Sequence, residues 1–274
     1  MKLELQQSQQ AAFIEKNFRN AFIASAHIQK QYNKSQYVFS KIPHPIFNCV
    51  VEAIALEHDV EKTVQCIWED YQKNNTPHCW WITQRSEPKS LTTHLEQLGF
   101  QKGPTYRGMH LNLKKMNIPS QSSPHIRIEQ VTRLEDFDDW IKPLEECFEL
   151  SKEVAIAFAE CYKNLHEKNN QFINYTAFYE NELAGVATLF LDKDSAGLYS
   201  GAVLPKFRNN GIITHLLNTL LTEAKNQGIE DVVTHVNEGT HNITLKAGFR
   251  EYLQLQAYLS PSDDMLKFKN LSHQ

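Results

Sequence analysis

The feature that most constrains the fold is a strand that ends at a proline and runs, through a short polar loop, into a helix. A strand is expected over 197–204, Pro205 stops it, and Gly211 stands just before a helix expected over 213–227. One face of this helix is apolar, which is typical of a helix packed on a sheet. The first amides of a helix lack acceptors within the helix, and the helix dipole places positive charge there. The segment therefore predicts α/β architecture with an anion site at the loop.

The elements around this segment extend the same architecture over the second half of the chain. Further strands are expected over 126–131, 172–179, 183–191, 231–236 and 252–259, and helices over 134–148, 151–165 and 240–247. The assignments rest on alternation of apolar and polar residues for strands and on helical spacing for helices. The order β-α-α-β-β-β-α-β-α-β predicts antiparallel strands that lead into a βαβ crossover.

The first half is less regular but ends in a similar way. Helices are expected around 13–22, over 60–71 and over 90–98, and strands at 79–83 and 109–113. The helix, Leu98-Gly99-Phe100 and strand at its end resemble the helix, Ala247-Gly248-Phe249 and strand of the second half. This echo suggests two related modules.

A polar stretch rich in serine and proline separates these modules. We expect an N-terminal domain over 1–118, a linker over 119–124 and a second domain over 125–274. Both domains are of ordinary size, and Ser/Pro-rich segments of this kind are typical linkers.

Composition narrows the class of protein. The chain has 274 residues, 41% of them hydrophobic and 22% charged, with a net charge of −4. These values exclude a disordered chain and give no reason to expect nucleic acid or a membrane as partner. The five cysteines are scattered without a C-x-x-C pair, so neither a zinc site nor a disulfide framework is expected, and no metal is predicted. Reduced thiols, a polar N-terminus and the lack of a bilayer-spanning run indicate a cytoplasmic protein.

Two motifs connect the second half to a known family. Val203, Pro205, Arg208 and Gly211 match V-x-P-x-x-R-x-x-G, which resembles the acyl-CoA-binding motif of the GNAT superfamily. GNAT domains also carry an Asn before a short helix that ends in Gly-Phe, and Asn237 stands at such a position. The resemblance covers 125–260.

The first half resembles, through 77–81 and 98–100, the degenerate N-terminal domain of tandem GNAT proteins. It lacks the V-x-P-x-x-R-x-x-G segment, so it is not expected to hold CoA in the usual way. The fold class that follows is α/β, with two GNAT-like domains. Each is expected to be a mixed, mostly antiparallel twisted sheet flanked by helices.

The resemblance implies acetyl-CoA as the acyl donor and names the residues that hold it. The backbone of Ala202 and Val203 is expected to pair with the pantetheine arm, and the Val203 amide to act as oxyanion donor. The diphosphate is expected on the backbone amides of Arg208, Asn209, Asn210, Gly211, Ile212, Ile213 and Thr214. Asn237 is the remaining residue expected to bind the cofactor. Arg208 can either add a charged contact or hold the loop.

The sequence departs from the family pattern at positions that bear on catalysis. Ile213 stands where the family has Gly or Ala, and Thr244 where it has the tyrosine that protonates the departing thiolate. His241 and Tyr252 flank the last helix and are the candidates to replace that acid. His235 lies on a strand and is interpreted as structural.

The predicted function is transfer of an acetyl group from acetyl-CoA to an amine. The acceptor is expected to be a small-molecule or peptide amine, and a homodimer stays open. The alternative is a non-catalytic acyl-CoA-binding module that acts through protein contacts. A longer acyl donor is a further alternative, because it needs only an open cavity beyond Val203.

Overall fold

The computed structural model describes residues 2–114, 116–119, 123–168 and 171–261, with the side chains of 2–6 left out. The helices are α1 (Lys2–Ser25), α2 (Val60–Lys73), α3 (Leu91–Gln97), α4 (Phe137–Cys147), α5 (Lys152–Lys168), α6 (Ile212–Asn226) and α7 (Glu238–Lys246). The strands of the first half are β1 (Ile28–Tyr32), β2 (Ser35–Phe39), β3 (Cys49–Glu52), β4 (Cys79–Ile82) and β5 (Gln101–Asn112). Those of the second half are β6 (Ile126–Gln130), β7 (Phe172–Tyr179), β8 (Glu182–Leu191), β9 (Ala196–Val203), β10 (Asp231–Val236) and β11 (Arg250–Leu259).

The described strands form one continuous sheet rather than the two sheets expected from the sequence. Its order is β1-β2-β3-β4-β11-β5-β10-β9-β8-β7-β6. Neighbouring strands are antiparallel except for two parallel pairs, β3 with β4 and β9 with β10. Helix α2 connects the first parallel pair and α6 the second, so each half contains one βαβ crossover. The mixed, mostly antiparallel α/β fold is confirmed.

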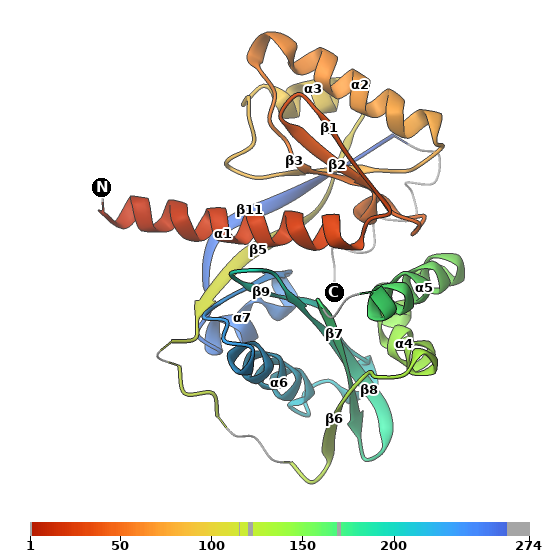
Figure 1. Ribbon diagram of the computed structural model, residues 1–274, viewed down its shortest axis with the longest axis vertical. Coiled ribbons are helices and arrows are strands. Elements are labelled where there is room, and N and C mark those ends of the chain that lie inside the picture. Colours follow the sequence, from red (N-terminus) through yellow and green to blue (C-terminus); the bar gives the residue numbers. More distant parts are fainter. Residues whose placement is uncertain (1, 115, 120–122, 169–170, 262–274) are drawn as a thin grey trace.

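The single sheet arises because the two halves exchange their last strands. The strand β5 ends the first half but pairs with β10 of the second half, Val233 opposite His110. The strand β11 ends the second half and pairs with β4 of the first half, Ala257 opposite Trp81. These two long strands also pair with each other and cross between the halves side by side (Figure 1). The division into domains at 119–124 therefore stays a prediction, and 120–122 of that linker lie outside the described residues.

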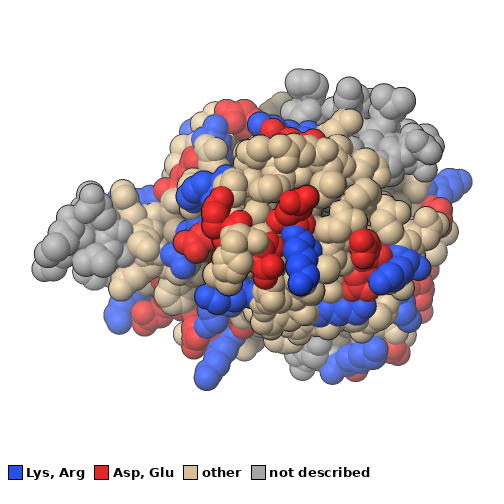
Figure 2. Space-filling view, turned by 90° about the horizontal axis from the view of Figure 1, so that it is seen from above, with Lys and Arg blue, Asp and Glu red and all other residues tan. Residues whose placement is uncertain are grey.

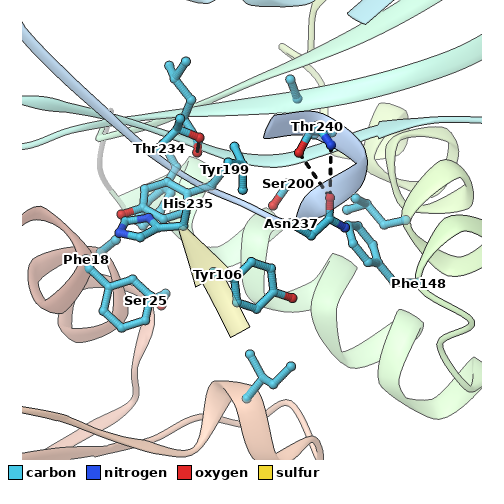
Figure 3. Close-up of a pocket in the computed structure, with 18 of the residues that line it drawn as sticks. Phe18, Ser25, Tyr106, Phe148, Tyr199, Ser200, Thr234, His235, Asn237 and Thr240 are labelled. Carbon is cyan, nitrogen blue, oxygen red and sulfur yellow. Dashed lines mark hydrogen bonds between the residues drawn. The ribbon is translucent and has the colours of Figure 1, made fainter. Parts of the chain in front are cut away.

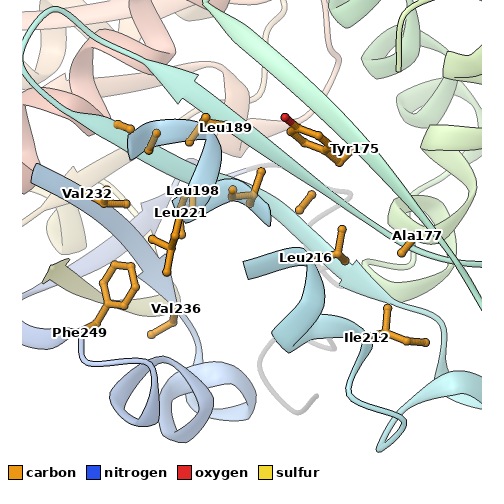
Figure 4. Close-up of a cluster of buried hydrophobic side chains, with 14 of the residues drawn as sticks. Tyr175, Ala177, Leu189, Leu198, Ile212, Leu216, Leu221, Val232, Val236 and Phe249 are labelled. Atoms are coloured by element: carbon orange, nitrogen blue, oxygen red, sulfur yellow. The ribbon is translucent and has the colours of Figure 1, made fainter. Parts of the chain in front are cut away.

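The two faces of the sheet in the second half are covered by different helices. Helix α6 packs its buried Leu216, Leu220 and Leu221 against Leu198 and Val232 of the sheet (Figure 4). Each such leucine stabilises the fold by about 1.5–3 kcal/mol when fully buried. Helices α4 and α5 cover the opposite face. The crossover thus holds the start of α6 beside the end of β9.

Helix α1 belongs to the first half but packs on strands of both halves (Figure 1). The buried Asn17 donates to Ser195 Oγ (2.9 Å) and accepts from the Tyr199 hydroxyl (2.8 Å). This close approach requires glycine at 197, because a Cβ there would lie 2.2 Å from Asn17 Oδ1. The helix therefore fixes Tyr199 and its neighbourhood on β9.

Acidic and basic side chains are intermixed on the face seen in Figure 2, with uncharged areas between them. This face carries no extended field of one sign of the kind that attracts polyanions. In the part of the chain that the structure describes, no helix is both long and apolar enough to cross a membrane.

Candidate functional site

The site begins at a break in the pairing of β9. The register between β8 and β9 shifts after Thr188, which faces Tyr199, so that Val186 faces Ala202. Ser200, inside this bulge, has a left-handed φ of +52°. Bulges of this kind bend a strand and re-aim its groups. The parallel pairing of β9 with β10 stops at Leu198, so the two strands part beyond the bulge.

The alternation of amides along β9 decides which groups face this gap. The Leu204 amide donates to the Ala184 carbonyl oxygen on β8 (2.9 Å). Successive residues of a strand point their amides to opposite edges. The Val203 amide therefore points away from β8 into the gap, where an oxyanion donor is expected. By the same alternation, Ala202 directs its backbone groups toward β8 and not into the gap, contrary to the pairing expected from the sequence.

The loop after β9 carries a run of backbone amides that no protein oxygen engages in the described part of the chain. A 3₁₀ turn spans Pro205–Phe207, and Gly211 precedes α6 with a φ of +79°. Among the described residues, no oxygen accepts a hydrogen bond from the amides of 209–213. The Arg208 and Thr214 amides, by contrast, donate to carbonyl oxygens of the loop, at 3.2 and 3.1 Å. Five successive amides at a helix start are thus available to an anion, two fewer than predicted.

The side chains of Arg208 and Asn210 bond carbonyl oxygens of this loop and hold its shape. They do not add donors to the run of free amides. Arg208 Nε donates to the Val203 carbonyl oxygen (3.4 Å), which also accepts from Cys147 Sγ at 3.4 Å. Asn210 Nδ2 donates to the Phe207 carbonyl oxygen (3.1 Å). Of the two roles open to Arg208, the geometry supports holding the loop. Burial raises the pKa of the Cys147 thiol, although Arg208 beside it opposes that shift.

The two isoleucines at the helix start have different surroundings. Ile212 is buried in the core beneath α6 (Figure 4). Ile213 faces a cavity, and its Cδ1 would lie 3.9 Å from a Cβ on Gly201. The methyl groups of Ile213 therefore occupy space above the bulge that a Gly or Ala would leave open.

A cavity of about 330 Å³ passes through the gap between β9 and β10. On one face of the sheet it is lined by Ile213 and Leu217 of α6, and on the other by Phe18 of α1 and Phe148 after α4. Figure 3 shows Phe18, Tyr106 and Phe148 around it. Cavities of this size hold small molecules. Residues from both faces of the sheet therefore line one continuous cavity.

The start of α7 also lines this cavity. Asn237 caps the helix, accepting from the Thr240 amide (3.3 Å) and the Thr240 hydroxyl (3.2 Å), as the dashed lines in Figure 3 mark. Thr244 faces the cavity one turn later, but its hydroxyl donates to the Thr240 carbonyl oxygen at 2.8 Å. The hydroxyl proton of Thr244 is therefore already engaged and poorly placed to reach a thiolate.

The other two acid candidates do not line the cavity. His241 Nε2 lies 3.3 Å from a carboxylate oxygen of Glu251, which is also paired with Arg107 (3.0 Å). Tyr252 packs edge-on against His110, with ring centroids 5.9 Å apart. The structure thus brings together Val203, the loop, Asn237 and Thr244, and leaves His241 and Tyr252 outside. In the described ranges, no group of three or more His, Cys, Asp or Glu residues is arranged to hold a metal.

Sequence reasoning missed two cavity residues, His235 and Tyr106. His235 stacks on Tyr199, with ring centroids 5.8 Å apart, and contacts Phe18 at 4.8 Å. Its two ring nitrogens are buried and have no hydrogen-bond partner within the described part of the chain. Burial lowers the pKa of His235 to about 3, so its imidazole is neutral. A histidine on a strand gives no sequence signal that it lines a cavity. Tyr106 was missed because it lies on β5, which reaches the cavity only through the exchange of strands between the halves.

The fold and the site define a class of α/β protein with a βαβ crossover, a bulged strand and a helix start with unengaged amides beside a cavity. Residues 134–249 match the acetyltransferase (GNAT) family, and the chain carries a GNAT acetyltransferase domain there. No match was found among curated proteins.

Three solved structures share the fold at low identity. A GCN5-related N-acetyltransferase from Kribbella flavida is 10% identical, with a TM-score of 0.72, and the match covers 94% of this chain and 98% of that one. A GCN5-related N-acetyltransferase from Sphaerobacter thermophilus is 15% identical, with a TM-score of 0.60 and coverages of 76% and 70%. A tandem GNAT protein from the clavulanic acid biosynthesis pathway is 14% identical, with a TM-score of 0.56 and coverages of 84% and 79%.

Proposed function

We propose that this protein transfers an acetyl group from acetyl-CoA to an amine. The observation that carries the proposal is the set of free amides at 209–213, placed where β9 and β10 part and a cavity begins. Such amides bind a diphosphate, and the adjoining gap suits an extended arm that leads to the cavity. The first half is proposed to be a degenerate GNAT-like domain that completes the cavity through Phe18 and Tyr106.

The chemistry assigned to the site is direct attack of the amine nitrogen on the thioester carbonyl. A C–N bond forms, the C–S bond breaks, and the Val203 amide stabilises the oxyanion of the tetrahedral intermediate. The amine nitrogen gives its proton to water, and the thiolate leaves and takes a proton from water, so that no proton is gained or lost overall. A thiol is a fair leaving group near neutral pH, so the engaged hydroxyl of Thr244 does not preclude turnover. Most of the rate comes from positioning the two reactants.

A non-catalytic acyl-CoA-binding module remains the second candidate. The observation in its favour is that no described carboxylate lines the cavity and that Thr244 is engaged. Release of free CoA from acetyl-CoA in the presence of a panel of amines separates the two. The compartment we propose is the cytoplasm, because the five cysteines form no disulfide.

The substitution Gly211→Asp tests the site. An aspartate there places a negative charge among the free amides and a strained φ at the helix start. Titration calorimetry should show CoA affinity reduced about tenfold or more, which corresponds to about 1.4 kcal/mol.

The matched control is Gly228→Asp at the other end of α6. Gly228 has a similar φ of +76°, and no atom lies within 4 Å of an added Cβ. Its substitution carries the same backbone strain and the same charge, so CoA affinity should stay near that of the natural chain. Equal affinity in both variants would rule out the loop as the CoA site.

A further inference from the structure

A second cavity lies in the first half, at the end of its own parallel pair of strands. The pairing of β3 with β4 stops at Val50, opposite Trp80. It resumes at Ile54, opposite Glu87. The chain on the β4 side is longer between these points, so the two segments cannot stay paired, and a cavity of about 310 Å³ opens there beside α1. Ligand sites in α/β sheets commonly lie at the carboxyl ends of parallel strands.

The wall of this second cavity is charged, whereas that of the cavity at β9 and β10 is not. Among the described residues that line the cavity at β9 and β10, none is Asp, Glu, Lys or Arg. Lys16 is paired with Asp194 (2.9 Å), which lies outside the second cavity. The other charged side chains of its wall form two ion pairs, Glu15 with Arg85 and Glu52 with Arg19.

These two ion pairs leave groups free to bind a ligand. Arg85 uses Nε for Glu15 (2.6 Å), and no oxygen of the described residues accepts a hydrogen bond from its two Nη atoms. The Arg85 side chain is 48% exposed, so a ligand can reach it. Glu52 uses Oε1 for Arg19 (2.5 Å), and its Oε2, which no described group engages, is not buried. The cavity thus offers a paired donor for a carboxylate and an acceptor for an ammonium group.

Glu15 connects these free groups. Its carboxylate accepts from the Thr83 hydroxyl and pairs with Arg85. Burial raises the pKa of Glu15, the bonds from Thr83 and Arg85 oppose that shift, and the nearby carboxylate of Glu52 adds to it. Two carboxylates at such a distance repel each other, and a cationic group beside them relieves the repulsion. Arg85 and Glu52 are therefore close neighbours of one side chain, as the two charges of a small zwitterion require.

The buried part of the wall is apolar. It contains Phe18, Val51, Trp81 and Leu255. Phe18 and Trp81 meet edge-on, with ring centroids 5.4 Å apart. Both also line the cavity at β9 and β10, so they form a wall common to the two cavities. An apolar group of a ligand is stabilised when it leaves water for such a surface.

We propose that the second cavity binds an α-amino acid with an apolar side chain, its carboxylate on Arg85, its ammonium group on Glu52 and its side chain toward the apolar wall. Such a ligand is neutral overall, which matches a wall of two ion pairs. An amine alone leaves Arg85 without an anion, and a carboxylate alone leaves Glu52 without a cation. The binding needs neither CoA nor acetyl transfer, because the cavity does not include the loop at 209–213.

Titration calorimetry on the full chain at pH 7.5 compares three probes with the same branched body. L-Leucine carries both charges, 3-methylbutylamine lacks the carboxylate, and 4-methylpentanoate lacks the amine. We expect leucine to bind at least about tenfold more tightly than either of the other two. No binding of leucine, or equal binding of the amine or the acid, overturns the proposal.

Two variants locate the binding. Glu52→Gln removes a charge at the same size and Arg85→Gln removes the guanidinium, and each should weaken leucine binding about tenfold. The matched control is Asp70→Asn. Asp70 pairs with Lys30 (2.8 Å) outside the cavity, and its side chain is 22% exposed against 26% for Glu52.

The control should bind leucine as the natural chain does. Unchanged leucine affinity in both cavity variants, or an equal loss in the control, would place the binding elsewhere and overturn the proposal. A cooperative thermal transition shows that each variant is folded. If a variant does not fold, the three probes on the natural chain still decide the class of ligand.

Discussion

Desolvation lowers the pKa of three histidines, so each of them is neutral at pH 7. The pKa is lowered to about 3 for His78 and His235 and to about 4 for His44. An unfolded histidine takes up a proton below about pH 6.5. Between that pH and the folded pKa the unfolded state therefore binds more protons, so stability is complete above about pH 6.5 and falls as the pH falls.

We predict that acidification from pH 7 to pH 5 destabilises the protein, by up to about 2 kcal/mol for each of these histidines. His78 stacks on Tyr71, with ring centroids 4.1 Å apart, so His78→Phe keeps an aromatic ring and removes the titrating group. Urea unfolding at the two pH values should show a smaller acid loss in the variant. An equal loss in both proteins would show that His78 does not titrate on unfolding.

At the same scale, the sequence could place the backbone of the site but not its side chains. The spacing of Val203, Pro205 and Gly211 was sufficient because the strand, loop and helix that they mark are local. Whether a side chain such as His241 or His235 faces the cavity depends on which strands become neighbours. That depends on contacts between residues more than a hundred positions apart.

At the scale of elements, α1 provides a buried polar contact between the halves, beside the strand pairing of β4 and β5 with the second half. Asn17 is fully buried and holds both Ser195 and Tyr199, whereas Asn20 bonds Asp192 (2.8 Å) at a part-buried position. Removing one partner of a buried hydrogen bond leaves the other group unpaired, and water cannot reach it to replace the lost bond.

Asn17→Ala should therefore lower the free energy of unfolding by about 2–4 kcal/mol, since the buried Ser195 hydroxyl and the part-buried Tyr199 hydroxyl lose their partner. Asn20→Ala serves as the matched control and should cost less than about 1 kcal/mol. Denaturant unfolding measures both. If both alanine variants lose the same free energy of unfolding, the hydrogen bonds of Asn17 contribute no more to stability than the more exposed bond of Asn20.

Element by element, the second half could be predicted and part of the first could not. The strands and helices from β6 to β11 were placed to within about three residues, because their apolar spacing is regular. The hairpin of β1 and β2 was missed, since Ile28–Tyr32 is an edge strand with three polar residues in five. Gly99 and Gly248, at the similar endings of the two halves, both have a positive φ. That the halves are related modules stays a prediction.

At the scale of the whole molecule, the exchange of β5 and β11 makes the halves depend on each other. Without the first half, β10 loses β5 from its edge, and the apolar face of Leu253 and Leu255 loses its cover of Phe18 and Trp81. An exposed strand edge and an uncovered apolar face both favour association with other chains.

We predict that the fragment 123–274 does not fold on its own. Circular dichroism should show no cooperative thermal transition for this fragment, and co-expression with the fragment 1–119 should restore one. A sharp transition in the isolated second half would mean that β11 can take the place of β5.

The same exchange sets the order in which the chain can be completed on the ribosome. The neighbour that β4 needs is β11, which is synthesised only after the other strands of the second half. The first half therefore cannot close its sheet when its own residues have emerged, and must wait for residue 259 with an edge still open. Domains commonly fold one after another during translation. Here the first half is instead expected to complete its sheet only once residue 259 has emerged, and to need protection against aggregation until then.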